Sequence, residues 1–279
     1  MRNLAFGLGA VHHPAMLSPL GESLRRHDPD RFLTTLFAPV ERREALVILF
    51  AFNHELARAR EVTSQSLLAL IRLQWWREVV EGEAKPGEIS TPLFDLIATG
   101  MVERETLLGM IDAREAEVDG HFETLQAWRD WLLAGAGGLA VAAGQALGVR
   151  DPQVLHGLRL RGAAYGAAGL LRSRFALARQ GFAPWPVDLL EHQGLIPEDA
   201  AARPTDAALV PVLSALKAEG AGWLKAARLA PPLPRVARAA ALPAILAARD
   251  LKRPLDQAPG LRGFGDRFAV TLAALFGRP

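Results

Sequence analysis

Apolar positions along this chain recur mostly at intervals of three and four residues, which is the period of one face of an α-helix. No stretch shows the sustained alternation of apolar and polar residues that is typical of a strand. The pattern therefore predicts an all-α protein. Its expected helices number about ten and cover residues 41–62, 64–81, 93–99, 103–119, 124–147, 152–180, 187–192, 205–229, 235–253 and 264–276.

Residues with special backbone properties mark the ends of several of these helices. Ser64 is a suitable N-cap for the second helix, and Gly82 ends it. Asp151 followed by Pro152 combines an N-cap with a proline at the first helical position, where the missing N–H costs nothing. The connections are short, so we expect one domain over residues 1–279, with the proline-rich turn at 231–234 as the only candidate boundary.

Small residues form rows at helical spacing on two neighbouring predicted helices. The rows consist of Ala136, Ala140, Gly144 and Gly148, and of Gly162 and Gly166 followed by Gly169. Such rows either let two helices approach closely or leave a cavity between them. The pattern favours close packing and leaves the cavity open as an alternative.

Composition excludes several classes of protein. The chain has 279 residues, half of them hydrophobic, and no cysteine, so disorder, disulfide scaffolds and thiolate chemistry are excluded. Its 32 Lys and Arg nearly balance 30 Asp and Glu, which gives no reason to expect a nucleic-acid partner.

The uncharged run at 131–149 is rich in Ala and Gly and is too weakly apolar for a membrane span. No secretory signal is visible. We therefore expect a cytoplasmic protein that rests at most peripherally on the inner face of the plasma membrane.

Motifs for nucleotide, serine-hydrolase or zinc chemistry are absent from the sequence. Paired carboxylates four residues apart are a standard way to hold magnesium, but no Asp-x-x-x-Asp sequence occurs. The only carboxylate series at this spacing contains Glu115, Asp119 and Glu123, joined by Asp112. It lies in a highly charged stretch, so it fits a solvated helix face better than a metal site.

Two segments nevertheless resemble a known family of enzymes. Residues 50–56 (FAFNHEL) and 72–77 (RLQWWR) are similar to the squalene/phytoene synthase family, and Gly181, Pro186 and Asp188 match a later motif in the right order. The likeness covers about residues 30–200, with 1–29 as an N-terminal extension. It implies a single helical bundle of the isoprenoid synthase type with a central apolar cavity. In active members of that family, two Asp-x-x-x-Asp motifs on facing helices hold magnesium ions that bind prenyl diphosphates.

The chain departs from the family at these metal-binding positions. The first motif reads Ala57, Arg58 and Glu61, and the second reads Ser173 and Leu177. Magnesium contributes several kcal/mol of charge stabilisation to a departing diphosphate, so its loss would leave ordinary squalene or phytoene synthesis severely impaired. No cofactor is expected on this interpretation.

A divergent subgroup of the family, which includes the mitochondrial assembly factor of respiratory complex I, matches the sequence better. This resemblance implies a membrane-associated, non-catalytic accessory protein. Its expected partners are complex I subunits or assembly intermediates, together with an isoprenoid or quinone-like lipid. The alternative is a magnesium-dependent head-to-head prenyltransferase with a rearranged site, in which Glu61 is catalytic and the metal ligands come from Glu61, Asp112, Glu115 and Asp119.

A third hypothesis is an anion binder without chemistry. Arg58, Arg172 and Arg174 would form a clamp for a diphosphate or a lipid head group, or would pair internally with Glu55, Glu61 or Glu78. Tyr165, the only tyrosine, lies on the helix that should line the family cavity and is a further ligand-binding candidate.

Overall fold

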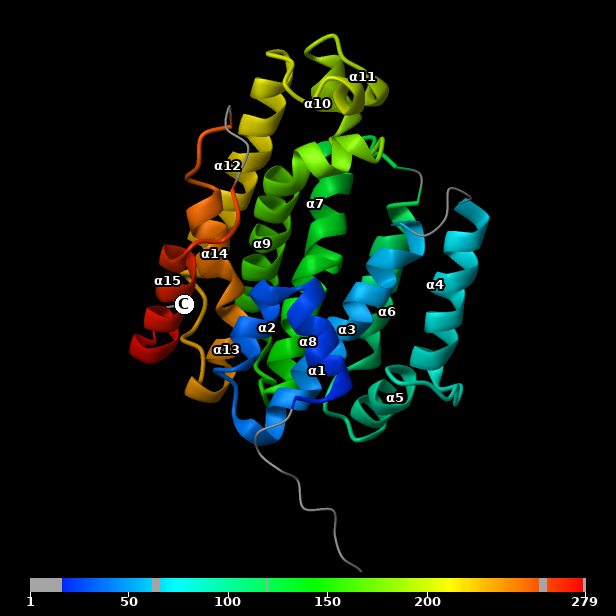
Figure 1. Ribbon diagram of the computed structural model, residues 1–279, viewed down its shortest axis with the longest axis vertical. Helices are drawn as coiled ribbons and strands as arrows, with labels where there is room; N and C mark the ends of the chain where they lie inside the picture. The colour runs from blue at the N-terminus through cyan, green and yellow to red at the C-terminus, as the bar shows by residue number, and fades with distance from the viewer. Residues whose placement is uncertain (1–16, 62–65, 119, 256–259, 278–279) are drawn as a thin grey trace, which may run out of the picture.

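Figure 1 shows a computed structural model of the protein, which is built of helices. The structure describes residues 17–61, 66–118, 120–255 and 260–277, but not the side chain of Glu61. The first helices of the chain are α1 (Pro19–His27), α2 (Pro29–Thr35), α3 (Val40–Glu61), α4 (Ser66–Glu81), α5 (Ser90–Ala98), α6 (Arg104–Ala116), α7 (Leu125–Ala134) and α8 (Ala136–Ala146). They are followed by α9 (Pro152–Arg179), α10 (Val187–Glu191), α11 (Pro197–Ala202), α12 (Leu209–Ala227), η1 (Arg235–Ala237), α13 (Arg238–Ala241), α14 (Pro243–Asp250) and α15 (Phe264–Phe276).

The long helix α9 is the centre of the bundle. It packs against α7 and α8 on one side and against α12 and α14 on the other, as Figure 1 shows. Helices α12 and α14 lie on either side of the proline-rich turn at 231–234, yet both contact α9. Strand pairing in the described ranges is limited to one bridge, between Phe122 and Pro186. The prediction of an all-α protein is confirmed.

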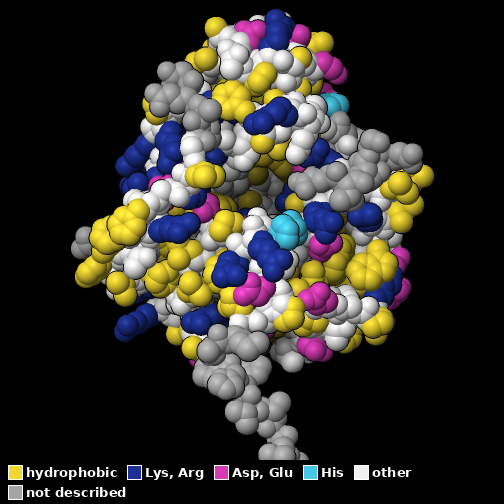
Figure 2. Space-filling view, in the orientation of Figure 1, with side chains coloured by type: hydrophobic (Ala, Val, Ile, Leu, Met, Phe, Trp, Pro, Cys, Tyr) yellow, Lys and Arg dark blue, Asp and Glu magenta, His cyan; other side chains and the backbone are white. Residues whose placement is uncertain are grey.

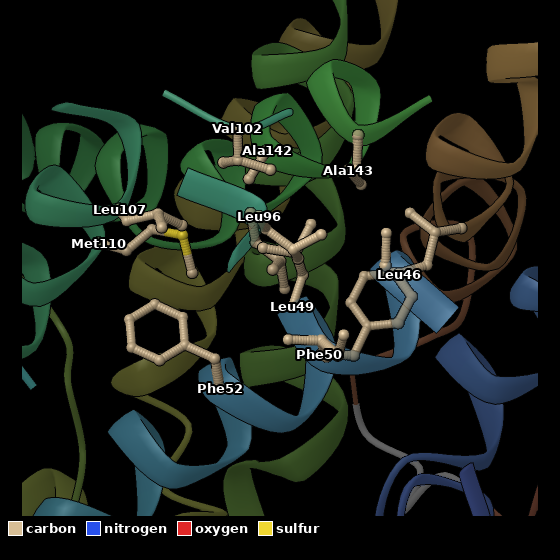
Figure 3. Packing of buried hydrophobic residues seen from close by; sticks show 14 of the residues in the cluster. Leu46, Leu49, Phe50, Phe52, Leu96, Val102, Leu107, Met110, Ala142 and Ala143 are labelled. Carbon is tan, nitrogen blue, oxygen red and sulfur yellow. The ribbon is translucent and has the colours of Figure 1, made fainter. Parts of the chain in front are cut away.

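A large apolar core lies between α3, α5, α6 and α8. Figure 3 shows Leu49 and Phe52 of α3 pointing into it together with Leu96, Met110 and residues of α8. The side chains of Leu49 and Phe52 are completely buried. Because side chains of this size each contribute about 1.5–3 kcal/mol on burial, this cluster fixes α3, and so one wall of the cavity described below.

Several predicted helices are shorter or divided in the structure. The expected helix at 124–147 is divided at Gly135. The N–H of Gly135 donates the last hydrogen bond of α7 to the carbonyl oxygen of Trp131, with an N–O distance of 2.8 Å. The expected helix at 235–253 is interrupted before Pro243, since a proline cannot donate the helical hydrogen bond. The ends marked by Gly82 and Gly181 are confirmed, and both glycines have positive φ. Ser64 lies outside the described residues.

The rows of small residues prove to be a close contact between α8 and α9. A methyl group on Gly162 would lie 2.4 Å from the carbonyl oxygen of Ala136, and one on Gly166 would lie 2.7 Å from the Ala136 Cβ. At Gly169, by contrast, a methyl group would meet no atom within 4 Å. The same helix therefore packs tightly in its middle and opens a space one turn later.

In the part of the chain that the structure describes, no helix is both long enough and apolar enough to cross a bilayer.

Candidate functional site

A cavity of about 700 Å³ opens beside α9 at the point where the glycine row loosens. Its wall on α9 is a stripe at four-residue spacing, made by Tyr165, Gly169, Ser173 and Leu177. Asn53 and Ala57 of α3 have the same spacing and form the facing wall. Figure 2 shows the molecule hollowed near the middle of the viewed face, with basic and histidine side chains around the opening. The cavity thus lies between α3 and α9, the two helices on which the sequence resemblance places the metal-binding motifs.

One side of the cavity is apolar. Trp131 and Leu132 of α7, Ala136 of α8, and Leu170 and Leu177 of α9 line it. This side matches the expected apolar cavity and has the character of a surface that accepts a hydrocarbon chain.

The other side is charged, and Arg172 is the one arginine of the proposed clamp that lines it. Among the described residues that line the cavity, two are aspartates and five are arginines: Arg31, Arg114, Arg172, Arg262 and Arg267. Asp28 pairs with Arg31 at 2.6 Å, and Asp30 pairs with Arg262 at 2.8 Å. The wall has more arginines than aspartates, so its charge favours an anionic or strongly polar group.

Tyr165 connects the two sides. Its ring lies 5.0 Å from the guanidinium of Arg31, and its hydroxyl is 3.5 Å from Asp30 Oδ2. Burial raises the pKa of Tyr165, and the negative charge of Asp28 raises it further, against the opposing effect of Arg31. The phenol is consequently neutral at physiological pH and can donate one hydrogen bond to a ligand or to Asp30.

A second charged group lies where α3 and α6 end. The buried carboxylate of Glu117 accepts from Arg114 Nη1 at 2.6 Å and from Arg60 Nε at 3.3 Å, while Arg60 stacks 3.6 Å from the ring of Phe182. Two guanidinium groups share one carboxylate, which leaves an excess positive charge beside the cavity. This group lies next to the α3 positions where active family members carry acids.

The three arginines proposed as an anion clamp do not converge. Arg172 lines the cavity and pairs with Asp250 at 3.2 Å. Arg58 is partly exposed and pairs with Glu55 at 3.1 Å, without lining the cavity. Arg174 is buried elsewhere and donates to the backbone oxygens of Leu171 and Leu255.

Of the four carboxylate candidates for a metal site, the structure describes the side chains of two, Asp112 and Glu115, and both lie away from the cavity wall. Asp112 and Glu115 both pair with Arg77 of α4, at 2.6 and 2.9 Å, and neither residue lines the cavity. Asp119 and the side chain of Glu61 are outside the described residues. The described part of the chain contains no group of three or more His, Asp or Glu side chains that could hold a metal ion.

The donor set at the cavity does not fit the magnesium ions that the family fold implies. Magnesium requires near-octahedral oxygen ligands, usually with carboxylates among them. Ala57, Ser173 and Leu177, which the sequence resemblance aligns with metal-binding positions, do line the cavity, but they supply only one hydroxyl oxygen. Among the described lining residues the carboxylates are Asp28 and Asp30, and both are already bound by arginines. No magnesium-assisted step is therefore derived for this chain.

Sequence reasoning missed most of the charged wall, including Arg31, Arg262, Arg267 and the stacked imidazoles of His27 and His54, whose centroids are 4.9 Å apart. A local signal existed for Arg31. Asp28 followed by Pro29 is the same start signature as at Asp151, and it predicts a helix with Arg31 in its first turn. For Arg262 no local signal existed, because its partner Asp30 is 232 residues away along the chain.

Comparison with known proteins places these observations in context. The squalene/phytoene synthase family profile matches residues 24–272, a longer span than the motifs covered. Among curated proteins, the chain is 28% identical over 192 residues to NADH dehydrogenase (ubiquinone) complex I, assembly factor 6, of Mus musculus, with 66% of this chain and 57% of that protein covered. The Homo sapiens protein of the same name is 24% identical over 212 residues, with 74% and 64% covered. The chain therefore spans less than two thirds of the length of these relatives.

Solved structures share the fold. A squalene synthase, HpnC, from Alicyclobacillus acidocaldarius superposes with a TM-score of 0.69 at 19% identity, covering 83% of this chain and 90% of that one. A dehydrosqualene synthase in complex with a ligand gives a TM-score of 0.71 at 11% identity, covering 92% and 94%. At such identities the likeness establishes the helical fold and nothing about activity.

Proposed function

The chain belongs to the squalene/phytoene synthase family, and from that membership we propose that it is a non-catalytic member acting as an accessory factor in the assembly of respiratory complex I. The observation that carries this proposal is the cavity wall. Ala57, Ser173 and Leu177 stand at the family's metal-binding positions, and arginines form much of the remaining polar surface. The two aspartates among the described lining residues are each paired with an arginine, so these residues offer no free carboxylate for the ions that activate a prenyl diphosphate.

The distant likeness to complex I assembly factor 6 supports the choice of partner. On this proposal the protein works in the cytoplasm, on the inner face of the membrane that holds the complex. Its partners are complex I subunits or their assembly intermediates.

Affinity purification of the tagged protein from native membranes is expected to enrich complex I subunits over other membrane proteins of similar abundance. Quantitative mass spectrometry against an untagged strain measures this enrichment. The purified protein should also fail to convert farnesyl or geranylgeranyl diphosphate in the presence of magnesium. Turnover that disappears in Glu61→Ala would contradict the proposal and establish the prenyltransferase alternative.

On this proposal the protein also binds a lipid in its cavity. Its apolar side fits an isoprenoid tail along Leu132, Leu170 and Leu177, and its charged side fits a polar head such as a hydroxyl or a quinone oxygen. Arginine and the neutral Tyr165 hydroxyl both donate hydrogen bonds to oxygen, so neither requires a metal ion.

Filling the cavity should abolish this binding. We expect Gly169→Leu to weaken the binding of geranylgeraniol by about tenfold or more, because the added side chain occupies the space of several methylene groups worth about 0.8 kcal/mol each. Calorimetric titration measures the change. Gly222→Leu is the matched control, since Gly222 is an exposed glycine of α12 where a methyl group meets nothing within 4 Å. Equal binding by the two variants would show that the lipid lies elsewhere.

A further inference from the structure

An apolar face of α15 points away from the rest of the protein. Five of its residues are more than one third exposed, namely Phe264, Phe268, Leu272, Leu275 and Phe276. Their spacing of four, four, three and one residues places them on one side of the helix, while Val270 and Ala273 are buried on the opposite side. Phe264 is 82% exposed and stacks on Phe268 with ring centroids 5.9 Å apart, so two aromatic rings lie together in solvent.

Basic side chains surround this face. The Arg238 guanidinium lies against Gly277 at the end of α15, so close that a methyl group on Gly277 would be 2.4 Å from its Cζ. Arg249 reaches the other end, where its Nε lies 2.6 Å from Asp266 Oδ1. Arg267 of α15 itself is exposed. Figure 2 shows this combination at the left edge of the molecule, where hydrophobic side chains over α15 are bordered by Lys and Arg.

The sequence concentrates positive charge in this part of the chain. From Leu229 to the C-terminus there are eight Lys or Arg and three Asp, a net charge of +5, whereas the whole chain carries only +2. The preceding 228 residues therefore carry a net charge of −3. The near neutrality of the whole chain conceals a basic C-terminal region around an exposed apolar helix.

We propose that the exposed face of α15 and its basic border form a docking surface for an anionic lipid bilayer. A helix lying in a membrane interface has a face of Phe and Leu that enters the acyl boundary and basic groups that meet the head groups. Each Lys or Arg near an anionic surface adds to binding, and the effect decreases with salt. Charge complementarity selects this occupant over a second copy of the chain, because two copies of the same basic surface would repel each other.

A second apolar surface, on α4, lacks the excess of positive charge that borders α15. Leu67, Leu68 and Ile71 are also exposed there. The adjoining groove, lined by Ile71 and Trp75, includes the carboxylates of Glu78 and Glu115. These acids are paired with Lys85 and Arg77, so this surface has no excess of positive charge to attract an anionic bilayer, and we assign the lipid surface to α15 alone. Figure 1 places the two helices at opposite edges of the molecule.

The docking surface borders the cavity. Leu261, which is 98% exposed, lines the cavity together with Arg262 and Arg267, and all three lie immediately before or within α15. A protein docked through α15 would hold the cavity mouth close to the bilayer. Only this last consequence, a short path for a membrane lipid into the cavity, rests on the proposed function.

Flotation of the full-length protein with phosphatidylglycerol vesicles tests the docking surface. We expect the protein to float with these vesicles, to float much less with phosphatidylcholine vesicles, and to be released as salt is raised. Leu275→Ser should weaken vesicle binding by about tenfold, because a leucine side chain is lost from the exposed face of α15 that would enter the bilayer. Leu67→Ser on α4 is the matched control, since Leu67 is 68% and Leu275 is 65% exposed, and it should bind like the unchanged protein.

Three results would overturn the proposal: no flotation of the unchanged protein, equal flotation with both lipids, or equal weakening by the two leucine substitutions. A dimer in solution that dissociates in Leu275→Ser would show that a second copy covers α15, and this too would overturn it. Circular dichroism confirms that each variant is folded. None of these outcomes bears on the enrichment of complex I subunits, so failure here is distinguishable from failure of the proposed function.

Discussion

Replacing Gly162 by alanine is expected to lower the free energy of unfolding by about 3 kcal/mol, at the upper end of the usual cost of overpacking. The added Cβ would lie 2.4 Å from the carbonyl oxygen of Ala136 and 2.9 Å from the Cα of Gly137. Both are backbone atoms of α8, so no side chain can move aside, and the two helices must separate. Because α8 and α9 form the most extensive helix pair in the bundle, the strain spreads through the core.

Gly169→Ala on the same helix is the control for this effect. Its Cβ meets nothing within 4 Å, so no contact has to move. Alanine in a helix interior is favoured over glycine by about 0.5–1 kcal/mol, so this variant should be slightly more stable than the unchanged protein. Chemical denaturation of the two variants measures the difference. Equal destabilisation would mean that the helix tolerates no side chain at either position and that close packing is not the cause.

The second large effect is expected at Arg262, which joins three segments of the chain. It pairs with Asp30 of α2 at 2.8 Å, with Asp250 of α14 at 2.7 Å and more loosely with Asp266 of α15 at 3.9 Å. The side chains of Asp250 and Asp266 are only 5% and 4% exposed. Asp250 keeps its pair with Arg172 and Asp266 keeps its pair with Arg249 in the variant. Arg262→Gln should therefore cost about 1.5–3 kcal/mol at neutral pH, the usual contribution of a hydrogen bond to a charged group, since one of the arginines that share these carboxylates is lost.

This loss should depend on pH in a defined direction. Burial alone would raise the pKa of Asp266, but the hydrogen bond from Arg249 and the charge of Arg262 together lower it below its ordinary value of 3.8. A carboxyl group with a lowered pKa in the folded state stabilises the protein above its unfolded pKa, and that stabilisation disappears as the pH falls through the folded pKa. The difference between the unchanged protein and Arg262→Gln should accordingly be largest near neutrality and shrink as the pH falls below about 4.

Denaturant titrations at several pH values measure this difference. Arg25→Gln provides the control, because its ion pair with Glu22 is short, at 2.7 Å, but the Arg25 side chain is 55% exposed. An exposed pair of this kind contributes about 1 kcal/mol or less. A pH-independent difference for Arg262→Gln would indicate that the arginine acts by packing and not by its charge.

Local signals in the sequence were enough to predict most helices and several of their ends. Gly82 and Gly181 end α4 and α9 as expected, because glycine tolerates the positive φ that both residues adopt, whereas other residues avoid it. The same kind of signal was present and overlooked at Ser18 and Asp28, each followed by a proline, where α1 and α2 begin. At Gly135, where α7 ends and α8 begins, a Cβ would lie 3.1 Å from the carbonyl oxygen of Trp131 in the preceding turn, which is tighter than an ordinary contact.

The candidate site was predicted only where it depends on one helix at a time. Tyr165 and Ser173 are eight residues apart on α9, so both fall on the side that lines the cavity. Arg172 and Arg174 are two residues apart, which on a helix means nearly opposite directions, and only Arg172 reaches the cavity. Spacing alone therefore argued against a clamp that uses both arginines.

The sequence by itself determined that the chain is helical and that it contains no Asp-x-x-x-Asp motif, because residue type and spacing are local properties. The tertiary structure decided which charged side chains meet. Arg262 meets Asp30 across 232 residues of sequence, and Arg60 meets Glu117 across 57. Such pairs form only when packing of α9 against its neighbours brings distant segments together. No local sequence pattern predicts which arginine pairs with which distant carboxylate. Arg31 and Arg114 pair with carboxylates three residues away, within reach of a local pattern, whereas the contacts of Arg262 and Arg60 exist only in the folded chain.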